Sequence, residues 1–309
     1  MLTKIMLDLF VSLTCVAAST AFSMKIIDAH LHIWSDKPEA FDSDQIPPAT
    51  LQHGATPEAL IQKMNDAGVK GALIVQPIYQ KFDHSYVTEA VKTYPHKFKG
   101  MMLHDPSLSP EMAVERLEAL VVLGFVGVRF NPYLWPEGEL ISDDSGGGLA
   151  VYKRCAELNI PVGIMCFKGL RLHLDDIIAL IEKSPHTQLI LDHLGFCALN
   201  DEGHVAFVEL LKLSKYPNVS VKISALFRNT GDVDKFPYDR IREERFKPLL
   251  KNFGPGRLMV GSDFPFVLET EGGYSGAINT VKSWLKDDEA ELVLFGTSER
   301  LFGRWGDVN

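Results

Sequence analysis

Residues 25–34, K-I-I-D-A-H-L-H-I-W, decide how this chain is interpreted. The stretch begins with apolar, β-branched residues and therefore predicts a β-strand. Because side chains alternate between the two faces of a strand, we expect Asp28, His30 and His32 to share one face. Two histidines separated by one residue at a strand end can bind a metal ion or handle protons. The ordinary alternative is one packed histidine and one in a loop.

The strand is the first of eight apolar segments that alternate with helical periodicity. The other seven cover residues 71–77, 98–104, 124–132, 160–166, 188–193, 219–224 and 257–263. This alternation implies parallel strands joined by helical crossovers. A doubly wound open sheet would alternate similarly, but eight strands with polar residues at nearly every strand end favour an α/β fold of the (β/α)8 TIM-barrel type. We expect residues 24–309 to form this single domain, with residues 239–253 as one helix and further helices at 275–285 and 287–294.

Composition agrees with one large domain and excludes several classes of function. The chain has 309 residues, of which 46% are hydrophobic and 23% charged, and a barrel of about 250 residues with extensions would account for them. A net charge of −9 gives no electrostatic support for binding nucleic acid. No segment after the N-terminal region approaches the ~20 apolar residues that span a membrane. We therefore expect a small-molecule partner, with a homo-oligomer left open.

Residues 1–23 do not fit the barrel pattern. A basic start, an apolar middle and small residues near its end are typical of a signal peptide, but Asp8 interrupts the apolar part. Because Met24 directly precedes the first strand, an upstream extension is equally consistent with the sequence. The four cysteines, Cys15, Cys155, Cys166 and Cys197, form no C-x-x-C pair, which favours free thiols in a reducing compartment. We expect the cytoplasm or an organelle such as the plastid ahead of secretion.

In a barrel the carboxyl ends of the strands meet at one face, where the chemistry takes place. The polar residues that the pattern brings there are His30, His32, Gln76, His104, Arg129, Cys166, Lys168, His193, Arg228 and Asp263. Arginine is seldom buried without an anion, so Arg129 needs either a structural carboxylate or a substrate carboxylate. Lys168 and Arg228 are weaker cases of the same kind. Lys222, inside a strand, would suit a Schiff-base aldolase, but no other feature supports that chemistry.

Five motifs together resemble the amidohydrolase-related family of the amidohydrolase superfamily, whose members include lactonases and decarboxylases. They are D-A-H-L-H, V-R-F-N-P, D-H-L-G, G-S-D-F-P and T-S-E-R-L-F, and the resemblance covers residues 24–302. The resemblance implies that Asp263 binds a metal, activates water, or does both, and that His193 contacts the metal or the substrate carbonyl. It also implies that Arg129 binds a substrate carboxylate.

The resemblance further implies a metal site made of His30, His32 and Asp263, with His193 as a fourth ligand. One divalent metal, Zn²⁺, would fit such a site with an open position. However, Arg129 and the G-I-M-C-F-K run stand where many superfamily members place a histidine or a carboxylated lysine. Metal-independent activity, which the resemblance also allows, therefore stays open.

The expected function is hydrolysis of a lactone or similar cyclic ester, and whether the substrate bears a carboxylate is left open. Asp263 would act as the general base on water, while His30, His32 and His193 polarise the carbonyl directly or through the metal. Arg129, with Lys168 or Arg228, would orient the substrate anion. Two alternatives remain: a metal-dependent non-oxidative decarboxylase on the same scaffold, and a barrel that has lost catalysis and serves as a binding protein. Cys166, where family decarboxylases usually offer a histidine, disfavours the first.

Overall fold

Eight parallel strands, hydrogen-bonded in chain order, form the centre of the computed structural model, which describes residues 24–41 and 45–306. The strands are β1 (Ile27–Leu31), β2 (Gly71–Val75), β3 (Phe98–Leu103), β4 (Phe125–Phe130), β5 (Val162–Ile164), β6 (Leu189–Leu191), β7 (Val219–Ile223) and β8 (Leu258–Val260). Leu31 pairs in parallel with Phe264, so β1 also meets the chain that follows β8. The predicted TIM barrel is confirmed.

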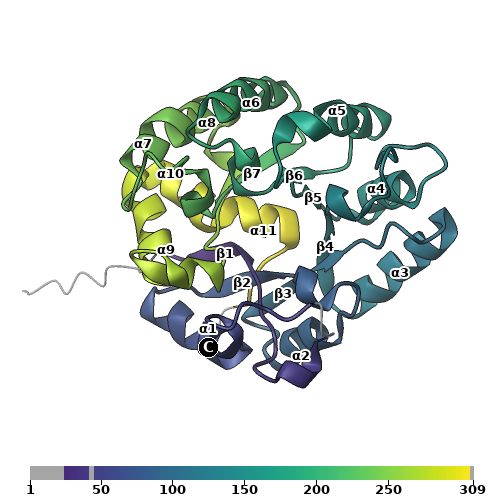
Figure 1. Cartoon of the computed structure of the whole chain (residues 1–309), viewed down its shortest axis with the longest axis horizontal. Coiled ribbons are helices and arrows are strands. Elements are labelled where there is room, and N and C mark those ends of the chain that lie inside the picture. The colour runs from purple at the N-terminus through teal and green to yellow at the C-terminus, as the bar shows by residue number, and fades with distance from the viewer. Residues whose placement is uncertain (1–23, 42–44, 307–309) are drawn as a thin grey trace, which may run out of the picture.

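Helices surround the strands on the outside, as Figure 1 shows. They are α1 (Pro57–Asp66), α2 (Ser85–Thr93), α3 (Pro110–Val122), α4 (Gly147–Leu158), α5 (Leu174–Lys183), α6 (Asp201–Lys212), α7 (Asp239–Ile241), α8 (Lys247–Phe253), α9 (Gly273–Trp284), α10 (Asp287–Glu291) and α11 (Thr297–Phe302). Two of them begin as helix-capping chemistry predicts. The side chains of Thr56 and Ser109 accept backbone N–H groups of Ala59 and Met112, and a proline follows each cap.

The helix expected at 239–253 is interrupted. Its middle turn, Arg242–Phe246, is a π-helix between α7 and α8, and a second π-helix, Leu292–Gly296, joins α10 to α11. Each π-turn is wider than an α-helical turn and shifts which side chains face the core. The periodicity of the sequence alone does not reveal this shift.

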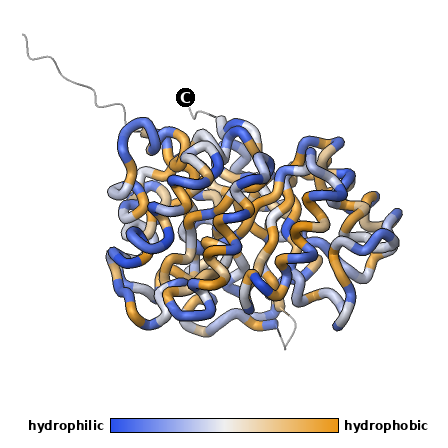
Figure 2. Tube along the Cα trace, turned by 90° about the horizontal axis from the view of Figure 1, so that it is seen from above, coloured by the Kyte–Doolittle hydropathy of each residue, from blue (hydrophilic) through white to orange (hydrophobic). Residues whose placement is uncertain are grey.

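The interior of the barrel is closed at the amino-terminal end of the strands. Leu301, Phe302 and Trp305 pack there against Ile27, Leu73 and other inward-facing residues of the strands. A Cβ on Gly71 would lie 2.3 Å from the Trp305 ring, so only glycine leaves room for that ring. Figure 1 shows α11 across the centre of the ring of helices, and Figure 2 shows hydrophobic segments running through the inside. This plug leaves the carboxyl ends of the strands as the open face.

The expectation for the face of Asp28 is wrong. Strand β1 loses its regular register with β2 between Asp28 and Leu31, so one extra residue stands in β1. This bulge reverses the alternation: Ile27 belongs to the barrel interior, whereas Leu31 packs outside. Asp28 therefore faces outward, where its carboxylate accepts the backbone N–H of Ser262 at 2.9 Å.

Residues 1–23, including Cys15, lie outside the described residues, so the leader is not tested. Cys155, Cys166 and Cys197 are buried free thiols. None of the helices in the described part of the chain has both the length and the hydrophobicity needed to cross a lipid bilayer.

Candidate active site

The three residues predicted to bind metal lie together at the open face. Ligand atoms of His30, His32 and Asp263 all fall within 4.8 Å of one another, and all three residues are buried. His30 and His32 come from the end of β1, and Asp263 follows β8. The two segments are adjacent because the barrel closes there, with the backbone N–H of Asp263 donating to the carbonyl of His30 at 2.9 Å.

The tautomer of His32 is determined by the backbone. Its Nδ1 lies 2.8 Å from the carbonyl oxygen of Val75, which can only accept a hydrogen bond, so Nδ1 carries the proton. The lone pair of Nε2 then faces Asp263 Oδ1, 3.6 Å away. Burial lowers the pKa of His32 to about 3, so the ring is neutral at physiological pH. A neutral imidazole with a free lone pair is what a metal ligand requires.

Asp263 combines burial with a nearby cation. Burial raises its pKa to about 6, although Arg228, whose Nε donates to Asp263 Oδ2 at 3.0 Å, partly opposes the shift. A carboxylate that titrates near pH 6 has the proton affinity that suits a general base at neutral pH. Its backbone adopts a positive φ of 62°, which is uncommon for a residue other than glycine and often marks a functional site.

His193 lies next to this cluster. Its ring centroid is 4.3 Å from that of His30, its Nε2 is 3.9 Å from Asp263 Oδ1, and its Nδ1 is 2.7 Å from Ser224 Oγ. Burial holds the pKa of His193 well below its ordinary value, so this ring is also neutral. His193 and the next three residues all have positive φ values. This unusual turn brings the ring back over the barrel.

A buried ion network supports the site from inside the barrel. Asp192 Oδ1 lies 3.1 Å from Lys222 Nζ and 3.3 Å from His30 Nδ1, and Asp192 Oδ2 accepts from Arg129 Nε at 3.0 Å. Burial alone would raise the pKa of Asp192, but Lys222, His30 and Arg129 together hold it well below its ordinary value. Arg129 therefore has the structural carboxylate that its burial required, and it also lines the cavity described next.

A cavity of about 300 Å³ opens above these groups. Its polar lining consists mainly of His32, Arg129, His193, Arg228 and Asp263. Apolar and aromatic residues that the sequence did not single out form the rest: Trp34, Pro77, Ile78, Tyr79, Met165, Phe167, Phe196 and Phe266. Most of them follow a strand end by only a few residues. That position in the sequence is the one signal that could have identified them as residues of the site.

Other predicted residues lie elsewhere. The side-chain amide of Gln76 donates to the backbone carbonyls of Lys81 and Asp83, and His104 stacks on Trp135 at 5.2 Å. Cys166 is buried, and burial raises the pKa of its thiol. Lys168 lies at the edge, its ammonium 5.0 Å from the Tyr133 ring, and lines a neighbouring cavity rather than this one.

The residues present fit a metal ion. His30 Nε2 is buried and has no hydrogen-bond partner among the described residues, which is costly unless a ligand occupies the space in front of it. Two imidazoles and a carboxylate are a common donor set for zinc. Nδ1 of His30 lies 3.0 Å from Lys222 Nζ and 3.3 Å from Asp192 Oδ1. A hydrogen bond donated by the Lys222 ammonium puts the ring proton on Nε2, whereas metal binding at Nε2 requires the proton on Nδ1, where Asp192 would accept it.

Comparison with known proteins gives one family and a shared fold. A profile of the family described as Amidohydrolase matches residues 27–304. No curated protein matches the chain. Among solved structures, a provisionally assigned 2-pyrone-4,6-dicarboxylic acid hydrolase from Pseudomonas putida has a TM-score of 0.72 at 22% identity, covering 91% of this chain and 98% of its own.

Two further structures are similar. An amidohydrolase from Burkholderia multivorans with bound zinc has a TM-score of 0.68 at 20% identity, covering 90% of this chain and 98% of its own. A 5-carboxyvanillate decarboxylase from Sphingomonas paucimobilis has a TM-score of 0.66 at 13% identity, covering 91% and 99%. At these identities the likeness shows the fold alone.

Proposed function

Because the chain belongs to the amidohydrolase family, we propose that it is a hydrolase that opens a lactone or similar cyclic ester. One observation carries the proposal: a buried carboxylate with a pKa of about 6, Asp263, shares a small aromatic cavity with two neutral histidines and two arginines. Hydrolysis of an anionic ester requires a general base to activate water, polar groups that hydrogen-bond the ester carbonyl, and cations that bind the substrate anion.

In the proposed reaction Asp263 takes a proton from water as the water oxygen attacks the lactone carbonyl. His193 Nε2, close to Asp263, would donate to the oxygen on which negative charge develops, and in that tautomer Nδ1 accepts a hydrogen bond from Ser224 Oγ. The bond between the carbonyl carbon and the ring oxygen then breaks. Asp263 returns its proton to that oxygen, so the product is the open hydroxy acid.

The cations position the substrate. Arg129 and Arg228 both line the cavity, and each uses Nε for a carboxylate of the protein. No described residue accepts a hydrogen bond from the terminal nitrogens of either guanidinium. A substrate carboxylate is the complementary group.

The metal is a second part of the proposal. His30, His32 and Asp263 would hold it. His193 would be a fourth ligand only with its proton on Nδ1, donated to Ser224 Oγ, and it would then not donate from Nε2 to the substrate oxygen. When bound, a zinc ion would act as a Lewis acid on the ester carbonyl and lower the pKa of water.

A decarboxylase on the same scaffold finds less support. It would need a group that protonates carbon near the end of β5, where the chain offers Cys166, a buried thiol that does not line the cavity. A barrel without catalysis would not need an ionisable carboxylate beside neutral histidines.

The test uses wild type and Asp263→Asn on a panel of neutral and carboxylate-bearing lactones and aromatic acids. We expect lactone opening by wild type and a kcat lower by about 10²–10⁴ in the variant, the usual range for loss of a general base. Retained zinc in the inactive variant would assign Asp263 as base, and lost zinc would assign it as ligand. Near-normal turnover by a folded Asp263→Asn protein contradicts the mechanism, and carbon dioxide release from the acids would identify the decarboxylase.

A further inference from the structure

We propose that a larger cavity beside the active site is a second subsite, which binds a flat apolar arm of the substrate that ends in a carboxylate. The substrate would then be an elongated lactone whose ester lies over Asp263 in the inner cavity and whose arm lies in the larger, outer cavity. The reaction assigned to such a molecule rests on the proposed function, whereas the binding of its arm does not.

The outer cavity measures about 750 Å³ and adjoins the 300 Å³ cavity of the site. Phe167, Phe196 and Arg228 line both. The outer cavity is formed by the segments that follow β5, β6 and β7 and by the start of α6. A substrate ring in the inner cavity therefore has a direct continuation into the outer one.

Two aromatic residues of the shared wall, Phe167 and Phe196, form an apolar surface that is partly open to solvent. Phe167 is 54% exposed and meets Phe196 edge to face, with ring centroids 5.6 Å apart. Leu172, on the same cavity, is 66% exposed. Exposed apolar side chains that gather at one cavity are typical of ligand-binding surfaces. A flat apolar group would cover the rings.

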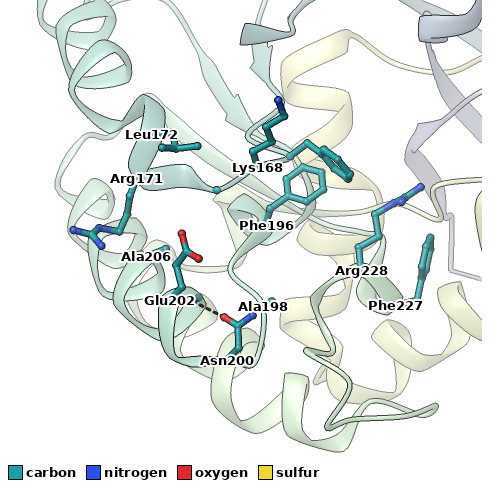
Figure 3. A pocket seen from close by; sticks show the side chains of 13 residues that line it. Lys168, Arg171, Leu172, Phe196, Ala198, Asn200, Glu202, Ala206, Phe227 and Arg228 are labelled. Carbon is teal, nitrogen blue, oxygen red and sulfur yellow. Dashed lines mark hydrogen bonds between the residues drawn. The ribbon is translucent and has the colours of Figure 1, made fainter. Parts of the chain in front are cut away.

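Charge around this wall favours an anion. Lys168, Arg171 and Arg228 contribute three cations, and Glu202 is the single carboxylate among the lining residues. Within the described chain, neither Lys168 nor Arg171 forms an ion pair. Figure 3 shows Phe196 in the middle, Lys168 above it, Arg228 on one side, and Glu202 and Arg171 on the other. A cationic group of this kind is unexpected in a chain of net charge −9.

Arg228 marks the boundary between the two cavities. Its guanidinium lies between the rings of Phe227 and Phe266, 5.0 and 4.8 Å from their centroids. Its Nε is fixed on Asp263. A molecule that passes this arginine therefore has one end at the general base and the other against the Phe167–Phe196 pair.

The test measures binding by calorimetry with a non-hydrolysable pair, 4-(tetrahydropyran-2-yl)benzoate and 2-phenyltetrahydropyran. We expect the benzoate to bind wild type about tenfold or more tightly, the size of one charge-assisted hydrogen bond. Lys168→Gln/Arg171→Gln should remove most of this preference, and Glu202→Gln should increase it. The control Lys92→Gln/Arg304→Gln removes the same charge from exposed positions near the amino-terminal end of the barrel and should keep the preference.

Equal binding of the two probes by wild type, or equal loss of preference in both double variants, overturns the second subsite. Turnover of δ-valerolactone and its 6-(4-carboxyphenyl) derivative separates this proposal from the proposed function. If lactones are opened without any preference for the carboxyphenyl arm, the subsite is wrong and the hydrolase stands. If the benzoate preference is found but no lactone is opened, the hydrolase is wrong and the subsite stands.

Discussion

The carboxylate of Asp28 joins the first strand to the segment after the last, because its Oδ1 accepts the backbone N–H of Ser262 at 2.9 Å and also that of His30 at 3.1 Å. Beside it, the backbone N–H of Asp263 donates to the carbonyl of His30. The seam that closes the barrel and the backbone that carries the candidate metal ligands are therefore the same few residues.

These hydrogen bonds predict that two substitutions at Asp28 affect the stability of the fold to different extents. Asp28→Ala leaves two buried N–H groups without an acceptor, at about 1–3 kcal/mol each, so its free energy of unfolding in urea should fall by a few kcal/mol. Asp28→Asn keeps an acceptor oxygen and should fold. Equal destabilisation by both would show that the negative charge, not the acceptor, matters.

The pH dependence of these proteins follows from the same carboxyl group. Burial raises the pKa of Asp28 to about 6, above its unfolded value of about 3.9. The folded protein thus prefers the protonated form, so this contribution to stability is full below about pH 4 and is lost as pH rises through 6. Compared with Asp28→Asn, wild type should lose unfolding free energy between pH 4 and pH 7, which urea titrations at several pH values would measure.

The pKa of Asp263 predicts how activity depends on pH. Since its pKa is about 6 when no metal is bound and the base must be ionised, kcat/KM of the metal-free protein should fall about tenfold per pH unit below pH 6. Residual activity of Asp263→Asn should lack this limb. Asp28→Asn is a matched control, because it removes another buried carboxyl with a pKa of about 6 and should keep the limb. If the limb vanishes in the Asp28 variant instead, the base is misassigned.

Arg129 is expected to bind substrate in addition to Asp192. Arg129→Met should raise KM for carboxylate-bearing lactones by about 10- to 100-fold, the equivalent of 1.5–3 kcal/mol, and change neutral lactones much less. Asp192 keeps Lys222 as a cationic partner in this variant, so the protein should fold. Lys222→Met is the comparison, because Lys222 contacts the same aspartate but does not line the cavity. If KM rises equally for carboxylate-bearing and neutral lactones, Arg129 has a structural role only.

Zinc affinity tests the ligand set without reference to turnover. In competition with a chelator, His32→Ala and Asp263→Ala should each weaken zinc binding by at least tenfold, whereas His53→Ala, at an exposed position, should not. His193→Gln would show whether this residue is the fourth ligand. Identical zinc affinity in all four variants would mean that the three clustered residues hold no metal.

Much of the fold follows from short-range features of the sequence. The alternation of apolar strands and amphipathic helices, with caps such as Thr56 and Ser109, is local chemistry and predicted the barrel. Because parallel strands align their carboxyl ends, the position of a residue just after a strand also placed His30, His32, His193 and Asp263 at one face.

What the sequence could not determine depends on partners from other strands and on single-residue shifts. The bulge in β1 turned Asp28 outward, and nothing local to that strand specifies it. Lys222 and Arg129 are both bound to Asp192, and this pairing exists only because β7 lies next to β6, and β4 two strands away, in the closed sheet. A buried charge must find its counterion within about 4 Å, and only the closed barrel decides which residues come that close.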